Sequence, residues 1–127
     1  MNGVVLVAIG GAAGSVLRYL TNGLAVRWFG LDFPYGTLAV NAIGSLLLGT
    51  IMHVGLTTDV LSPTLRLTLA TGVMGGFTTY STFNYETMEY LREGAFWLAG
   101  INVAATLVLC LLAGALGLAL ARWLVGS

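Results

Sequence analysis

One short stretch of this sequence combines hydroxyl, aromatic and acidic side chains in a pattern suited to ion chemistry. It is MGGFTTYSTFNYE, residues 74–86. Hydroxyl groups can donate hydrogen bonds to an anion, and the edges of aromatic rings carry partial positive charge. Gly75 and Gly76 lower helix propensity just before the hydroxyl residues, which compete for backbone hydrogen bonds. The pattern predicts a helix break followed by a polar and aromatic helix face.

Beyond the predicted break, an aromatic pair and several polar residues follow at helical spacing. Tyr80 and Phe83 are three residues apart and therefore share a helix face. Two ring edges beside a narrow path can contact an anion without binding it tightly; the alternative is ordinary packing. Ser81 and Thr82 lie beside the pair as hydrogen-bond donors, and Glu86 follows one turn after Thr82.

Two further polar side chains lie within apolar segments. Arg18 costs about 2.5 kcal/mol or more at the centre of a bilayer, so it either lines a polar cavity or snorkels from the end of a shorter helix. Asn41, one turn after Thr37, either forms a helix–helix hydrogen bond or faces water. Because no carboxylate accompanies Arg18 in the first two apolar segments, a cavity lined this way favours an anion.

The elements that carry these residues are predicted to span a membrane. The chain has 127 residues, of which 57% are hydrophobic and only 8% are charged, against about 25% charged residues in a typical soluble domain. About 20 apolar residues cross a bilayer, and four segments reach that length. They run from about 4 to the low or mid twenties, about 37–56, about 63–88 and about 96–125. Since lipid excludes unpaired backbone, we expect one all-α, four-helix transmembrane domain over residues 1–127.

Small residues recur at a spacing of four in two of these segments. Gly10 and Gly14 lie in the first segment, and Ala113 and Gly117 lie in the fourth. Such pairs let helix backbones approach closely. They predict packing faces and not binding sites.

Enzymatic chemistry finds no support in the sequence. It contains no histidine pair, cysteine cluster, phosphate-binding glycine loop or nucleophile triad. His53 is the only histidine and lies near the end of the second segment, where an interfacial residue is expected. Cys110 is the only cysteine and lies in an apolar run, as a packing residue would. We therefore expect that the protein is not an enzyme.

Arginine placement predicts that the chain inserts in both orientations. With four spans, Arg66 and Arg122 fall on one side of the membrane, and Arg27 and Arg92 fall on the other. The sequence has no lysine, and Arg18 is expected within the membrane. Because basic residues set orientation, two arginines against two give no preference. An antiparallel homodimer follows naturally from such dual topology.

Three motifs in order carry a family resemblance. They are GGAAGSVLRY at 10–19, YGTLAVNAIGS at 35–45 and TGVMGGFTTYSTF at 71–83. The chain resembles, over essentially its whole length, the small four-helix fluoride channels of microbes, the CrcB-type fluoride exporters. The resemblance implies a fluoride-selective channel in the cell (plasma or inner) membrane that exports fluoride passively and confers fluoride resistance.

The resemblance also implies an assembly, a cofactor and roles for named residues. The expected partners are fluoride, a second antiparallel copy and the bilayer, and not nucleic acid. A structural sodium ion is implied at the dimer centre, held by the backbone carbonyls of Gly75 and Thr78 from each subunit. The implied fluoride path contains the aromatic pair Tyr80 and Phe83, the pore asparagine Asn41, the vestibule arginine Arg18, and the polar residues Thr37, Ser81, Thr82 and Glu86.

The chain departs from the family pattern at several positions. Tyr80 stands where phenylalanine is common, so its ring edge or its hydroxyl is the contact for an anion. In the fourth segment, Asn102, Thr106 and Cys110 stand where tyrosine or serine is expected. Asn102 and Thr106 keep hydrogen-bonding capacity, whereas Cys110 largely loses it and is given no pore role.

Two other functional classes fit the sequence less well than a channel. A proton-driven drug exporter also has four spans, but it needs an acidic residue in the first helix, and no carboxylate precedes Asp32. A structural membrane subunit without transport leaves the polar break unexplained.

Overall fold

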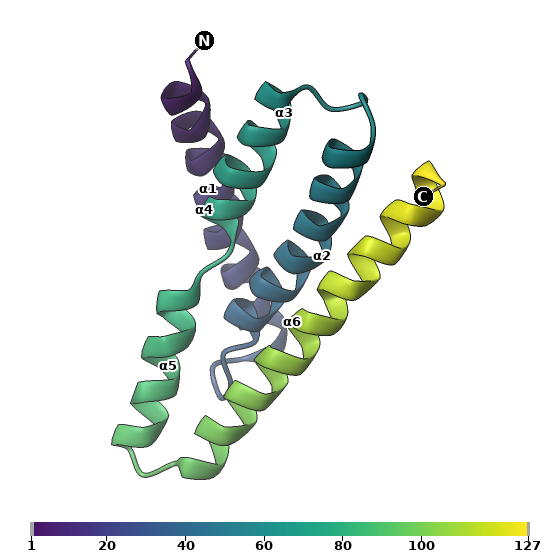
Figure 1. Cartoon of the computed structure of the whole chain (residues 1–127). Helices are drawn as coiled ribbons and strands as arrows, with labels where there is room; N and C mark the ends of the chain where they lie inside the picture. Colours follow the sequence, from purple (N-terminus) through teal and green to yellow (C-terminus); the bar gives the residue numbers. More distant parts are fainter. Residues whose placement is uncertain (1, 127) are drawn as a thin grey trace.

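Four helical segments run back and forth in the computed structural model, which describes residues 2–126. Helix α1 spans Gly3–Phe29, α2 spans Tyr35–Thr57, and α6 spans Phe96–Val125. The third segment, which comes between α2 and α6 in the chain, is interrupted. The N-terminus, the α2–α3 connection and the C-terminus lie toward one end of the molecule (Figure 1). This places Arg66 and Arg122 at one end and Arg27 and Arg92 at the other, as predicted.

Three of these segments are long and apolar enough to cross a membrane as single helices: α1, α2 and α6. The third segment was predicted as a span with a break, and the structure confirms the break. It consists of α3 (Pro63–Leu67), the π-helix η1 (Thr68–Met74), α4 (Gly75–Phe77) and α5 (Tyr80–Arg92). The chain between α4 and α5 is visibly extended (Figure 1).

The break lies just after the glycines that predicted it. Thr78 has ψ 158° and Thr79 has φ −153°, so both are extended, whereas Gly75 and Gly76 are still helical. A Cβ on Gly76 would lie 3.1 Å from the Cα of Gly11 in α1. Gly76 therefore serves close helix packing, and the hydroxyl residues after it carry the change in direction. The predicted interruption is therefore present, at Thr78 and Thr79.

Helix ends follow local capping signals. The Asn2 side chain accepts a hydrogen bond from the Val5 amide at 3.1 Å and begins α1. The helix continues to Phe29 and ends where Gly30 adopts a φ of 85°, a conformation open to glycine. The expected end in the low or mid twenties was therefore too early. Ser62 caps α3 by accepting from the Leu65 amide at 3.1 Å.

The predicted small-residue faces pack two helix pairs closely. A Cβ on Gly10 would lie 3.1 Å from the Cα of Gly72 in η1. On the other side of the molecule, a Cβ on Gly117 of α6 would lie 3.2 Å from the Cα of Leu46 in α2. The Thr50 hydroxyl adds a 3.0 Å hydrogen bond to the Gly117 carbonyl. These contacts fix α1 against the first half of the third segment and α2 against α6.

The buried core is small and lies beside the break. Val40 of α2, Met74 and Phe77 form it, and all three are buried. Most other large apolar side chains are exposed in the single chain. In a membrane protein such surfaces face lipid or another subunit.

Candidate functional site

Asn41 binds the backbone of the third segment at its break. Its Nδ2 donates to the Thr79 carbonyl at 3.0 Å, and its Oδ1 accepts from the Thr79 amide at 2.8 Å. The Thr79 amide, which loses its helical acceptor at the break, is thereby paired, and the Thr79 carbonyl gains a side-chain donor. Of the two interpretations of Asn41, the interhelical hydrogen bond is therefore present. One N–H of Nδ2 stays available because an amide nitrogen carries two donors.

Arg18 reaches the break from the neighbouring helix. Its Nε donates to the Gly76 carbonyl at 3.0 Å, and the residue is half-buried in the middle of α1. In a continuous helix that carbonyl would accept from the Tyr80 amide, but the break removes this partner. The interpretation in which Arg18 snorkels from a helix end is wrong, because α1 continues for eleven residues past it. Arg18 instead lines a polar cavity, the other interpretation.

The Gly75 carbonyl also loses its helical partner. That partner would be the Thr79 amide, which donates to Asn41 instead. Gly75 is exposed, and a Cβ built on it would meet nothing within 4 Å. In residues 2–126 no group of three or more His, Cys, Asp or Glu side chains is placed to hold a metal ion. Any cation near the break would therefore rely on backbone oxygens such as these.

A first cavity of about 350 Å³, the polar cleft, collects one set of the predicted residues. Inside it the Thr37 hydroxyl donates to Glu86 Oε2 at 2.9 Å, while Glu86 Oε1 is buried and without a partner in the described chain. The cleft thus holds a guanidinium and a carboxylate on opposite helices. It is lined by Ser15, Arg18, Tyr19, Asn22, Gly36, Thr37, Val40, Thr79, Thr82 and Glu86.

A second cavity of about 560 Å³, the aromatic groove, collects another set. The rings of Tyr80 and Phe83 meet edge to face, with centroids 5.8 Å apart at 62°. Tyr80 is 78% exposed, so its outer face is free in the single chain. Asn41 and Thr78 line the groove with this pair, opposite Thr106 and Cys110 of α6.

The predicted path residues therefore divide between two cavities of one chain. Arg18, Thr37, Thr82 and Glu86 line the polar cleft, and Asn41, Tyr80 and Phe83 line the aromatic groove. Thr79 lines both. Ser81 is exposed and lies 3.5 Å from the Thr79 hydroxyl, measured between the two oxygens.

Thr79 was not among the predicted path residues, although it organises the site. Its hydroxyl accepts from the Thr82 amide at 3.2 Å, which caps α5, and donates to the Thr82 hydroxyl at 2.9 Å. Its backbone is bound by Asn41. Threonine directly before a helix is a preferred N-cap residue, a signal that sequence reasoning can use.

The α6 residues also differ in placement. Asn102 is 1% exposed and its Nδ2 donates to the Thr87 hydroxyl at 3.0 Å. It therefore links α6 to α5 and has a structural role. Thr106 and Cys110, in contrast, line the aromatic groove. Cys110, which was given no pore role, thus lies nearer the candidate path than Asn102.

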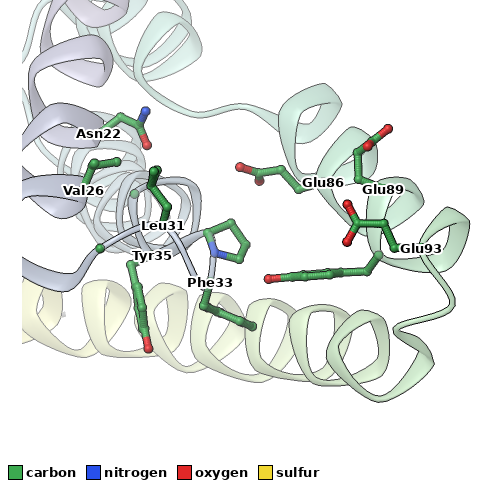
Figure 2. A pocket seen from close by; sticks show the side chains of 12 residues that line it. Asn22, Val26, Leu31, Phe33, Tyr35, Glu86, Glu89 and Glu93 are labelled. Atoms are coloured by element: carbon green, nitrogen blue, oxygen red, sulfur yellow. The ribbon is translucent and has the colours of Figure 1, made fainter.

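A third cavity of about 250 Å³, the mouth, opens beyond the polar cleft. It shares Asn22, Gly36 and Glu86 with the cleft and continues outward to Glu89 and Glu93 (Figure 2). Arg92 pairs with Glu89 at 2.7 Å, measured from Nη2 to Oε1. The mouth is therefore acidic at its rim and leads inward to the guanidinium of Arg18.

Comparison with known proteins gives the family. The model of the family described as "CrcB-like protein, Camphor Resistance (CrcB)" matches residues 5–118. The chain belongs to this CrcB-like family. The match covers all four helical segments and the break, so this CrcB-like chain is a multi-pass membrane protein.

Several curated relatives are similar over nearly their whole length, and each is named "Fluoride-specific ion channel FluC". One from Sorangium cellulosum is 58% identical over 122 residues, 95% of each chain. One from Anaeromyxobacter sp. (strain K) is 52% identical over 97% of this chain and 98% of the relative. One from Geobacter sulfurreducens is 47% identical over 98% of this chain and 100% of the relative. The family is one of ion channels, so the CrcB-like chain is not an enzyme.

Proposed function

We propose that this protein is a fluoride-selective channel of the cell membrane that lets fluoride leave the cytoplasm passively and so confers fluoride resistance. The observation that carries the proposal is the 58% identity, over 95% of the chain, to a relative named as a fluoride-specific ion channel. The geometry supports it, because donors and ring edges line cavities on both sides of Thr79.

The proposed mechanism replaces the water around fluoride with weak contacts. Fluoride is small and strongly hydrated, so a pore must supply donors yet release the ion. The free N–H of Asn41 and the ring edges of Tyr80 and Phe83 would supply contacts in the aromatic groove. In the polar cleft, Arg18 supplies positive charge and Thr82 a hydroxyl. No step couples transport to another ion or to a proton.

Purified protein in liposomes should pass fluoride and nearly exclude chloride. The reason is that a short row of donors and ring edges matches a small anion, whereas chloride is larger. A fluoride electrode and a chloride electrode would record the efflux from the same preparation. Fluoride efflux no faster than from protein-free liposomes would overturn the proposed function.

The working unit of this proposal is an antiparallel homodimer. Two observations support it: Arg66 and Arg122 at one end balance Arg27 and Arg92 at the other, and the Tyr80 ring is 78% exposed in the single chain. An exposed aromatic residue at the edge of a cavity suits contact with a second subunit.

A structural sodium ion at the centre of that dimer completes the proposal. The Gly75 and Thr78 carbonyls from each subunit would hold it, since a hard cation prefers oxygen ligands. The support is that the Gly75 carbonyl has lost its helical donor and that nothing covers Gly75 in the single chain.

Assembly and sodium are checked together. Native mass spectrometry of the purified protein should give the mass of two chains with one sodium ion bound, because the site needs carbonyls from both copies. Tagging a single gene copy should find both orientations in one membrane. A single orientation, or a sodium-free dimer that keeps its stability in sodium-free buffer, would contradict this part of the proposal.

A further inference from the structure

Asn22 lies where two of the cavities meet. It lines the polar cleft on its inner side and the mouth on its outer side. Figure 2 shows Asn22 and Glu86 on opposite walls, with the Glu86 carboxylate pointing into the space between them. Asn22 and Glu86 therefore flank the region where the mouth joins the polar cleft.

The backbone of α2 is shaped around this amide. A Cβ built on Gly36 would overlap the Asn22 side-chain oxygen and lie 2.9 Å from the Asn22 Cα. Only a residue without a Cβ lets α1 and α2 approach here. The oxygen is the atom of the Asn22 amide group that lies nearest to Gly36.

The Asn22 donors are available for a ligand. Within residues 2–126, the Asn22 amide has no hydrogen-bond partner. Arg18, one turn earlier in α1, is the residue that bonds to the third segment, through the Gly76 carbonyl. An amide nitrogen offers two N–H donors. Asn22 and Arg18 lie four residues apart and so share a face of α1.

The charge around the mouth makes a neutral donor useful. Glu86 faces Asn22, and the paired Glu89 and, just past the end of α5, Glu93 lie farther out. An anion entering from this end meets carboxylates before it reaches Arg18. A donor opposite Glu86 offsets that repulsion where the passage joins the two cavities.

We infer that the Asn22 amide is a further ion-contacting group, which passes an anion between the mouth and the Arg18 end of the polar cleft. The inference rests on the proposed fluoride-channel function and adds a residue of the first helix to the path. Gly36 acts as a positioning residue, because its missing Cβ gives Asn22 its place.

The test compares fluoride efflux from liposomes for matched variants. Asn22→Leu removes the donors at similar size and should slow fluoride efflux about tenfold, the usual effect of losing a hydrogen bond to a charged group. Asn22→Asp adds negative charge opposite Glu86 and should conduct less than Asn22→Leu. Asn22→Ser keeps a donor and should conduct more than either.

A second comparison tests Gly36 against a control glycine, Gly23. Gly36→Ala should displace Asn22 and slow efflux about tenfold, by the same lost donor, whereas Gly23→Ala adds the same methyl group where nothing lies within 4 Å. Gel filtration would identify variants that do not fold. Among the variants that fold, faster fluoride efflux through Asn22→Ser than through Asn22→Asp supports the role of Asn22.

Each outcome separates the two proposals. Efflux through Asn22→Leu within about twofold of the wild type, well below the loss of a charged hydrogen bond, would overturn the role of Asn22 while leaving the channel intact. Equal efflux through Asn22→Ser and Asn22→Asp would do the same. Wild-type protein that passes no fluoride would instead end the proposed function, and the inference with it.

Discussion

Asn41→Leu should abolish ion flux and lower the free energy of unfolding by about 3 kcal/mol. The substitution leaves the Thr79 amide without an acceptor in the middle of the third segment, where the break has removed its helical partner, and it takes the Asn41 donor away from the Thr79 carbonyl. A buried backbone group without a partner costs about 1–3 kcal/mol, and lipid offers no water to replace the amide. Thermal unfolding in detergent, followed by circular dichroism, measures the loss.

Two variants sharpen this prediction. Asn41→Asp keeps an acceptor for the Thr79 amide but cannot donate to the Thr79 carbonyl when ionised, so its stability should fall between the wild type and Asn41→Leu. Asn84→Leu makes the same change at an exposed position of α5 and should shift the free energy of unfolding by less than about 0.5 kcal/mol. If Asn41→Leu unfolds at the same temperature as Asn84→Leu, Asn41 does not hold the break.

Gly14→Ala should separate α1 from the third segment. An added Cβ would overlap the Val73 carbonyl and lie 2.8 Å from the Phe77 amide nitrogen. Both are backbone groups that cannot rotate away, so the helices must move apart by a methyl group's width. We expect the free energy of unfolding to fall by about 2–3 kcal/mol. The Arg18 hydrogen bond to the Gly76 carbonyl should be lost, and the folded yield should drop strongly.

Gly23→Ala is the matched control for Gly14→Ala. It lies in the same helix, and a Cβ there meets nothing within 4 Å. Alanine is a better helix former than glycine by about 1 kcal/mol, so this variant should be as stable as the wild type or slightly more so. Equal melting temperatures for the two alanine variants would contradict the close packing of α1 against the break.

The outline of the fold was readable from apolar length alone. Segments of about 20 apolar residues gave α1, α2 and α6, and glycine followed by hydroxyl residues predicted an interruption in the third segment. The ends were less certain, because α1 continues past Thr21, Asn22 and Arg27 to the turn at Gly30. Helix ends depend on which residue finally caps them, and several polar residues near a membrane surface offer competing signals. The π-helical turn at Thr68–Met74 had no signal in the sequence.

The candidate site was predicted as a set of residues but not as an arrangement. Arg18, Asn41 and Glu86 were identified because polar groups in apolar segments are costly. Their partners are 38–58 positions away along the chain, and no local pattern specifies such distances. Thr79, which joins both cavities, and Asn22, which joins the cleft to the mouth, were missed because one polar residue near a helix end has many ordinary roles.

By itself, the sequence determined that this chain belongs in a bilayer as a helical protein, that its third segment is interrupted, and that its polar groups suit an anion. These follow from composition and local propensity, which act within a few residues. Only the tertiary structure decided that Asn41 pairs with Thr79, that Arg18 reaches the Gly76 carbonyl, and that the polar residues divide between two cavities. The physical reason is that a break frees backbone groups whose partners must come from other helices, and helix packing alone selects which side chains arrive.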